Sequence, residues 1–296
     1  MPIFKVVVAA VLFLVEEVQT NIFDQRFIES ELWKRDIPTL RKRFGDVAKT
    51  GSLDQDKRLF VDGTEVAVVY FRHGFMPQNY ISEQCWDARL MMERSLAAKC
   101  PDIHTHLVGT KKVQQVLAKP GVLEKFFPDQ PQVVEQLRAT FVGLYTLDMG
   151  PDGDKSVAMA LAEPDQFVLK PQREGGGNNL YGSELFQVLN RVKGSSERAA
   201  YILMDKIFPA SVQNYLLRRD APLEISSCVN ELGMYGVYVR YANAPLPALI
   251  CGEPMGRGTH VSALDCARPG SMGESLATRH SPACPIFRPS SRVGPR

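Results

Sequence analysis

The sequence predicts an α/β fold of mixed strands and helices (α+β), and three segments carry this prediction. An apolar, β-branched run at residues 6–15 (VVVAAVLFLV) precedes a helical pattern from Ile22 to Trp33, which makes a strand-to-helix unit. Residues 59–71 (LFVDGTEVAVVYF) have the pattern of a β-hairpin. A strand, a glycine-rich loop, a helix and another strand then follow between residues 167 and 207. Such alternation is typical of mixed α/β proteins.

The first apolar run has two interpretations. Lys5 followed by 6–15 resembles the start of a secretory signal. However, the run ends at Glu16-Glu17 without a small-residue cleavage site, is too short for a membrane span, and is rich in β-branched residues. We therefore favour a parallel core strand, followed by a helix that Asn21 caps and that ends before Pro38. Its apolar positions at helical spacing are Ile22, Phe23, Phe27, Ile28, Leu32 and Trp33.

The hairpin prediction rests on Asp62-Gly63, because both residues tolerate the positive φ of a tight turn. Its second strand delivers the segment RHGF, residues 72–75, at its carboxyl end. Open α/β sheets bind ligands beyond the carboxyl ends of their strands, so we expect a substrate contact there. The alternative for Arg72 is an ordinary solvated residue at a strand end.

The middle of the chain, residues 86–141, is predicted to be mainly helical, with breaks at its prolines. Lys111-Lys112 opens one of these helices, and a helix start favours anions. A surface turn and a short helix are predicted within 147–163, a helix at 183–193 and a strand at 200–207. Residues 225–232 and 234–239 have the pattern of a second hairpin.

The glycine-rich loop, KPQREGGGNNLYG at 170–182, contains the chemistry expected of a phosphate site. Gly175, Gly176 and Gly177 remove every Cβ from a stretch whose amide groups can form an anion nest. Lys170 supplies a cation, and Glu174 a hard oxygen ligand of the kind that Mg2+ prefers beside phosphates. The loop matches neither a Walker A sequence nor a G-x-G-x-x-G fingerprint, so a mobile hairpin turn is the alternative.

Composition and cysteine usage narrow the classes of partner. The 296 residues are 45% hydrophobic and 23% charged, which is typical of a soluble globular protein. A net charge of +2 excludes a large basic surface, so we expect a small-molecule substrate and neither nucleic acid nor a membrane. The six cysteines include no C-x-x-C pair, which argues for free thiols and a cytoplasmic location. Residues 241–296 are rich in Pro and Gly and lack Lys, and we expect them to be largely disordered.

These motifs resemble those of the eukaryotic glutathione synthetase family. The resemblance covers the C-terminal half of that family and roughly residues 6 to 240 here, and it rests on the segments NIFDQR, LFVDG, VVYFR, AAKCPDI, GTKKVQQ and KPQREGGGNNLYG. It implies an ATP-grasp core with an inserted parallel-sheet domain that binds substrate. The implied domains are a substrate-binding domain at 1–108, an ATP-grasp portion at 109–240 and a divergent tail at 241–296.

The resemblance also implies a reaction and its participants. ATP would phosphorylate the terminal carboxylate of γ-glutamylcysteine, and glycine would attack the resulting acyl phosphate to give glutathione, ADP and phosphate. Mg2+ and a homodimer are implied as well. Substrate-side positions would be Asn21, Gln25, Arg72 and Gly74. Nucleotide-side positions would be Lys111, Lys170, Glu174, Gly175, Gly176, Gly177, Asn178, Asn179, Tyr181, Met204, Asp205, Lys206, Ile207 and Glu231, with Glu174 also holding the metal.

Several positions depart from the family pattern. His73 and Phe75 stand where an acidic residue and a tyrosine are usual, Gln19 and Thr20 match poorly, and Lys112 and Arg173 are expected to be solvated charges. The family's N-terminal half and its C-terminal substrate loop have no counterpart in the sequence. The alternative function is therefore a catalytically impaired fragment that binds nucleotide weakly or dimerises with full-length subunits. A sugar- or nucleotide-binding protein unrelated to ligases is a third class.

Overall fold

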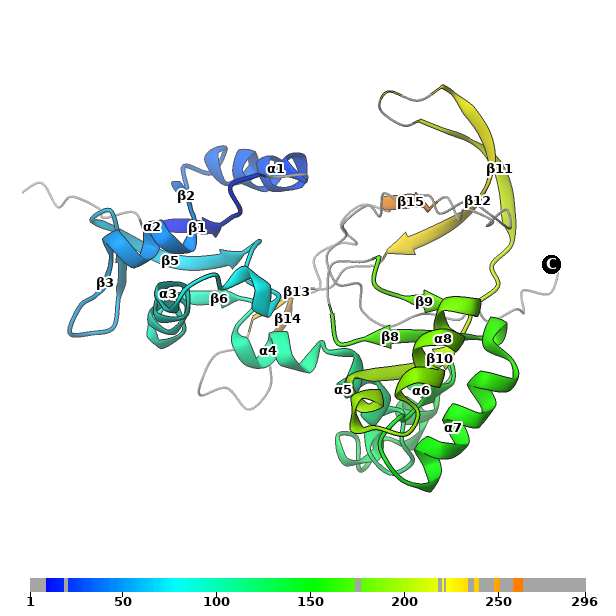
Figure 1. Cartoon of the computed structure of the whole chain (residues 1–296). Helices are drawn as coiled ribbons and strands as arrows, with labels where there is room; N and C mark the ends of the chain where they lie inside the picture. The colour runs from blue at the N-terminus through cyan, green and yellow to red at the C-terminus, as the bar shows by residue number, and fades with distance from the viewer. Residues whose placement is uncertain are drawn as a thin grey trace, which may run out of the picture. The chain divides into compact units, whose positions relative to one another are not determined.

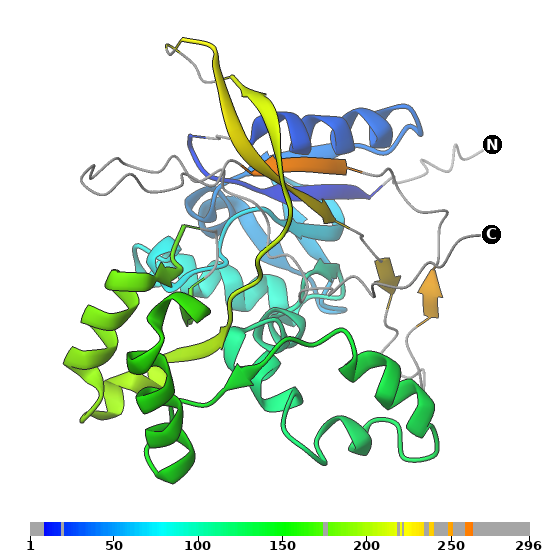
Figure 2. The same ribbon diagram turned by 90° about the vertical axis from the view of Figure 1, so that its right-hand side faces the viewer.

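The structure is a computed structural model that describes residues 9–18, 21–173, 177–217, 220, 222–233, 237–239, 248–250 and 258–262. These residues divide into two compact units, one up to Asp205 and one from Lys206 (Figures 1 and 2). The first unit holds a six-stranded and a four-stranded sheet, and the second holds a three-stranded and a two-stranded sheet. The mixed α/β prediction is confirmed.

The six-stranded sheet is mixed, with the order β2-β1-β5-β4-β3 and β6 also paired to β5. Its strands are β1 (Ala10–Leu14), β2 (Thr39–Lys42), β3 (Gly51–Leu53), β4 (Leu59–Val61), β5 (Thr64–Phe71) and β6 (Ala98–Cys100). Strand β1 is parallel to both β2 and β5, and four of its five residues are buried, as expected of a core strand. The parallel strand predicted within 6–15 is thus confirmed for its described part.

The β4–β5 hairpin turns at Asp62 and Gly63, which have φ values of 49° and 74°. Both values lie in the left-handed region that a two-residue type I′ turn requires. The predicted hairpin is therefore confirmed, and its second strand delivers residues 72–75 beyond the carboxyl end of β5.

Helix α1 (Ile22–Trp33) starts after Asn21 and ends before Pro38, as predicted, but Asn21 makes no side-chain capping hydrogen bond and the apolar positions do not form an inner face. Phe23 and Phe27 are 74% and 71% exposed, whereas Gln25 and Glu29 are completely buried. Arg41 on β2 explains the difference, because its guanidinium donates to Gln25 Oε1 at 2.7 Å and to Glu29 Oε1 at 2.8 Å. A polar network, rather than apolar packing, holds this face of α1.

The remaining helices of the first unit cover the two sheets and connect them. They are α2 (Phe44–Thr50), α3 (Glu83–Arg94), α4 (Ile103–Val108), α5 (Lys111–Leu117), α6 (Pro131–Arg138), α7 (Pro151–Ala162) and α8 (Gly182–Val192), with 3-10 turns at Pro77–Asn79, Leu123–Lys125, Pro164–Gln166 and Ser196–Ala200. The helix predicted to open at Lys111 does so. Among the described residues, none of these helices combines the length and apolar character that a bilayer crossing requires.

The four-stranded sheet is antiparallel, with the order β7-β10-β8-β9. Its strands are β7 (Leu144–Tyr145), β8 (Phe167–Pro171), β9 (Leu180–Tyr181) and β10 (Tyr201–Asp205). Its core includes Leu147, Leu169, Leu185, Leu189 and Leu203, each completely buried. A separate core within residues 12–97 belongs to the six-stranded sheet. The predicted boundary between residues 108 and 109 lies between these cores and stays a prediction.

The second unit contains β11 (Ser211–Leu216), β12 (Glu224–Gly233), β13 (Val237–Val239), β14 (Ala248–Ile250) and β15 (Gly258–Ser262). The hairpin predicted from 225–232 and 234–239 is wrong, because β12 pairs with β11 and β15 on its two edges and β13 pairs with β14. Two short strands, β14 and β15, lie within 241–296, and the predicted disorder of most of this tail stays a prediction. The rest of 241–296 lies outside the described residues.

The polar contact between α1 and β2 gives a test of stability. We expect Arg41→Met to lower the free energy of unfolding by about 3 kcal/mol, because it leaves the completely buried Glu29 with less compensation for its charge. Urea denaturation measures this. Arg35→Met is the matched control, since it removes a solvent-exposed pair with Glu31 and should leave the unfolding midpoint unchanged. Equal effects of the two substitutions would contradict the proposed importance of the buried network.

Candidate functional site

The predicted phosphate and base segments lie on neighbouring strands of the four-stranded sheet. Lys170 on β8 is opposite Ile202 on β10, and Met204 on β10 is opposite Val168 on β8. Lys170 is partly exposed, and Met204 is buried. The pairing therefore brings the predicted phosphate lysine within two residues, along the sheet, of the predicted base-reading segment.

The glycine-rich loop at 170–182, the predicted lid loop, is described only in part. Glu174, Gly175 and Gly176 lie outside the described residues. Gly177 has φ of 65°, and Asn179 donates from Nδ2 to the Tyr181 hydroxyl at 3.2 Å. Tyr181 is 42% exposed and closes the loop by pairing with Val168 on β8. Both ends of the predicted phosphate loop are thus anchored on adjacent strands, β8 and β9.

The Asp205 carboxylate is engaged inside the protein. It accepts from the Gly143 backbone N–H at 3.0 Å and from the Tyr145 hydroxyl at 3.0 Å. Burial, reinforced by the Asp205 carboxylate, raises the pKa of Tyr145. A Cβ at Gly143 would collide with both Asp205 and Tyr145, so this contact requires glycine. The Asp205 N–H also donates to the Gly143 carbonyl oxygen at 3.0 Å, so residues 143–145 engage both the carboxylate and the amide of Asp205.

The other predicted nucleotide residues occupy several elements. Lys206 and Ile207 follow β10 and belong to the second unit, where Lys206 Nζ lies 5.2 Å from the centre of the Phe208 ring. Glu231 lies in β12, in register with His260 of β15. Asn178 is partly buried before β9. Lys111 is the first residue of α5.

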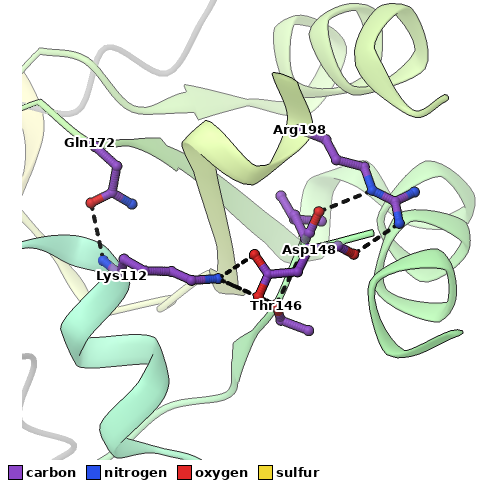
Figure 3. A network of polar contacts seen from close by, with 6 residues as sticks. Lys112, Thr146, Asp148, Gln172 and Arg198 are labelled. Carbon is purple, nitrogen blue, oxygen red and sulfur yellow. Dashed lines mark hydrogen bonds and ion pairs between the residues drawn. The ribbon is translucent and has the colours of Figure 1, made fainter. Parts of the chain in front are cut away.

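Lys112 corrects one prediction, because it is an ion-paired residue rather than a solvated charge (Figure 3). Its Nζ donates to both oxygens of Asp148 at 2.7 Å, and its side chain is 31% exposed. Thr146 donates to Asp148 Oδ2 at 2.8 Å. The bond from Lys112 chiefly, with that from Thr146, lowers the pKa of Asp148 below its ordinary value. Arg173 is exposed, as predicted.

A buried arginine fixes the segment that carries Asp148. Arg198 is 2% exposed, and its guanidinium donates to the carbonyl oxygens of Leu147 at 3.0 Å and Asp148 at 2.9 Å. It also donates to the Lys193 carbonyl oxygen at 2.8 Å and pairs with Asp154 Oδ1 at 2.6 Å. Arg198 therefore ties three backbone segments into one block.

The predicted substrate edge forms where β1 and β5 end side by side. Leu14 is in register with Phe71, and the Arg72 N–H donates to the Leu14 carbonyl oxygen at 3.0 Å. Just beyond, His73 Nδ1 lies 3.0 Å from Glu16 Oε1, within hydrogen-bonding distance. The departure from the family pattern at His73 is thus accompanied by a carboxylate partner, Glu16, just beyond the end of β1.

The four predicted substrate residues differ in accessibility. Gln25 is completely buried, donating to Asn21 Oδ1 at 3.0 Å and accepting from Arg41, so it orients Asn21 and the helix. Arg72 is partly exposed and lies over the Tyr70 ring at 5.7 Å. Gly74 has φ of 88°, and its carbonyl oxygen accepts from the Tyr80 hydroxyl at 2.9 Å. Gln19 and Thr20 lie outside the described residues.

Sequence reasoning missed the residues that support these segments. Arg41, Asp148 and Arg198 each have a partner that is distant in the chain, 12, 36 and 51 positions away respectively, and no local spacing marks such pairs. Glu16 and His73 follow the adjacent strands β1 and β5, so a search for complementary side chains just beyond neighbouring strands would have found this pair. The contacts of Arg41, Asp148 and Arg198 can be identified only once the fold is known.

The described residues do not by themselves form a metal site. They contain no group of three or more His, Cys, Asp or Glu side chains that could hold an ion. The predicted ligand, Glu174, lies outside them, so magnesium stays a prediction. The described cysteines, Cys85, Cys100 and Cys228, are free thiols as expected.

Comparisons with known proteins agree on one family. A family model described as the ATP-binding domain of eukaryotic glutathione synthase matches residues 15–253, beyond the residue 240 at which the resemblance was expected to end. Glutathione synthetase of Xenopus laevis is 60% identical over 233 residues, which cover 79% of this chain and 49% of the relative. The human glutathione synthetase is 53% identical over 274 residues, covering 93% and 56%. The chain thus spans about half the length of these relatives.

A solved structure shares the fold. A glutathione synthetase-like effector from Globodera pallida superposes with a TM-score of 0.58 at 21% identity, covering 78% of this chain and 49% of that one. This likeness concerns the arrangement of elements.

The positive φ at Gly74 generates a prediction about the substrate edge. Gly74→Ala should destabilise the fold by about 2–4 kcal/mol, because a Cβ would lie 2.7 Å from Phe44 Cζ on a backbone that L-residues rarely adopt. Urea denaturation is the measurement. Gly45→Ala, in helix α2 with open space around its Cβ, should instead be neutral or slightly stabilising. Similar behaviour of the two variants would refute the steric requirement.

The Asp148 carboxyl gives a pH prediction. Its pKa is lowered in the folded state, so its contribution to stability is present above the ordinary pKa of about 3.9 and is lost as pH falls through the lower folded value. Asp148→Asn should therefore be slightly less stable than the wild type at pH 7, because a partly exposed ion pair contributes little, and the difference should shrink steadily below about pH 4. Urea denaturation at a series of pH values measures the difference. A difference that stays constant down to the acid limit would exclude this ion pair as its source.

Proposed function

The chain belongs to the eukaryotic glutathione synthase family, and from this premise we propose that it provides the nucleotide site of an ATP-dependent ligase that joins γ-glutamylcysteine to glycine. The core around β7–β10 would be the ATP-grasp portion, and the six-stranded sheet the substrate-binding part. The products would be glutathione, ADP and phosphate.

One observation carries this proposal: the antiparallel pairing of β8 with β10. It aligns Lys170 with Ile202, two residues before Met204, on the next strand. Two residues of strand span about 7 Å, so a nucleotide lying along the strands would reach both Lys170 and the backbone of Met204–Asp205. Because residues 143–145 engage both the carboxylate and the N–H of Asp205, this residue would hold the end of β10 in place beside the nucleotide.

The proposed reaction has two steps. A terminal carboxylate oxygen of the dipeptide attacks the γ-phosphorus of ATP, and the bond to the β-phosphate oxygen breaks to release ADP. The glycine amine then attacks the acyl carbon, loses a proton, and displaces phosphate. Lys111, Lys170 and the lid amides would hold and neutralise the phosphates, since positioning and charge stabilisation supply most of the catalysis in such reactions.

On the substrate side, we assign the contacts to the carboxyl ends of β1 and β5. Arg72 provides a guanidinium suited to a carboxylate, and Gly74 lets the backbone approach closely. Asn21 would contact the peptide, whereas the completely buried Gln25 would orient Asn21. The Glu16–His73 pair would replace the acidic side chain usual at position 73.

Glu174 is the residue that would hold Mg2+ together with phosphate oxygens, and the ion would supply neutralisation of phosphate charge. By family, we also propose a homodimer in the cytoplasm. Nothing in the comparisons favours the alternative of an impaired fragment, which turnover measurements would reveal.

Nucleotide binding tests the proposal directly. Mg-ATP should raise the melting temperature of the chain, because a ligand that binds only the folded state stabilises it. Lys170→Met should weaken Mg-ATP binding about 10- to 100-fold, through the loss of a charge-assisted bond. Lys155→Met, an exposed lysine on α7, is the control and should bind like the wild type.

Turnover measurements distinguish an active ligase from a catalytically impaired fragment. ADP release that requires both γ-glutamylcysteine and glycine would support the ligase. Mg-ATP binding without ADP release at high enzyme concentration would support the impaired fragment. An absence of both would refute the proposed nucleotide site.

A further inference from the structure

Three side chains join the two segments that carry the proposed phosphate lysines (Figure 3). We propose that Gln172, Lys112 and Asp148 form a positioning clamp that sets the spacing between the backbone at Lys111 and the backbone at Lys170. The clamp rests on the proposed function for its role in ATP binding. Its three members themselves need not touch the nucleotide.

The first contact ties the base of the lid loop to helix α5. Gln172 Oε1 accepts from the backbone N–H of Lys112 at 3.1 Å, across 60 positions of sequence. Lys170 lies two residues before Gln172, and Lys111 directly precedes Lys112. The Gln172 N–H also donates to the Ala200 carbonyl oxygen at 3.2 Å. Gln172 thus holds α5 while its own backbone is attached beside β10.

The second contact fixes the other side of Lys112. Its ammonium group bridges both oxygens of Asp148, and Thr146 donates to one of these oxygens. The Asp148 N–H donates to Thr146 Oγ1 at 3.2 Å, which closes a local turn. Since the Asp148 carbonyl oxygen is held by the buried Arg198, the carboxylate is a fixed point to which Lys112 is attached.

The solvent exposure of the Lys112–Asp148 pair indicates that it positions the Lys112 segment more than it stabilises the fold. Lys112 and Asp148 are 31% and 45% exposed, and ion pairs of this kind add little to the free energy of unfolding. Arg138 and Glu124 form a closely matched pair, 28% and 46% exposed, between α6 and the 3-10 turn at Leu123–Lys125. Of these two pairs, the Lys112 pair is the one joined to both segments that carry the proposed phosphate lysines. A displacement of about 1 Å in such segments is enough to weaken transition-state contacts strongly.

Amide exchange tests the clamp without any ligand. Asp148→Asn and Gln172→Ala should each speed hydrogen exchange at the Lys112 amide by about tenfold, which corresponds to the loss of one hydrogen bond. Glu124→Gln is the matched control and should leave that amide unchanged. Equal exchange in Asp148→Asn, Gln172→Ala and Glu124→Gln would overturn the clamp.

Nucleotide titration tests its role. Asp148→Asn and Lys112→Met should bind Mg-ATP about tenfold more weakly, with a larger fall in kcat than rise in KM, while adenosine binding is unchanged. Lys112→Arg keeps the ion pair and should restore most of the affinity and rate. Loss of adenosine binding as well would mean general damage and would overturn the positioning role. A wild type without Mg-ATP binding would refute the proposed function, and the amide exchange would still decide whether the clamp exists.

Discussion

The proposed nucleotide site depends on the hydrogen bonds that the buried Arg198 guanidinium donates to three backbone carbonyl oxygens. Arg198 is 2% exposed, and its donors satisfy the carbonyl oxygens of Leu147, Asp148 and Lys193. Burying a charge is costly unless it is paired and hydrogen-bonded, and Asp154 completes that compensation. Gly153 leaves space for this packing, since a Cβ at position 153 would collide with the Asp148 carbonyl oxygen. A strong local requirement therefore fixes the backbone from which Asp148 projects.

The regular elements were largely predictable from sequence because their signals are local. The apolar run at 10–14, the Asp62-Gly63 turn and the strand–loop–helix–strand order from 167 to 205 all follow from side-chain period and turn chemistry. The strand pairings of the second unit were not predictable. A run such as 224–233 shows that it is a strand but not which neighbours occupy its edges, because pairing is settled by contacts distant in sequence.

Helix α1 shows the same limit for burial. Its apolar spacing indicated an apolar inner face, yet Gln25 and Glu29 are inside and Phe23 is outside. A single residue, Arg41 on β2, reverses the orientation by offering these side chains a buried hydrogen-bonding partner. For the site, sequence could indicate which residue types suit phosphate and base. It could not indicate that Lys112 is paired, since its partner Asp148 lies 36 positions away.

These contacts converge on one short stretch, residues 143–148. On one side, Gly143 and Tyr145 bind the Asp205 carboxylate and hold the end of β10, which is the proposed base-reading segment. On the other, Thr146 and Asp148 bind each other and Lys112, which Gln172 links to the lid. The two tasks fall to the two ends of the stretch, the first at the short strand β7 and the second just after it. With Arg198 anchoring the same stretch through its carbonyl oxygens, the phosphate segment and the base segment share one support. The spacing of these two proposed segments is therefore set by residues 143–148 rather than by the glycine-rich loop.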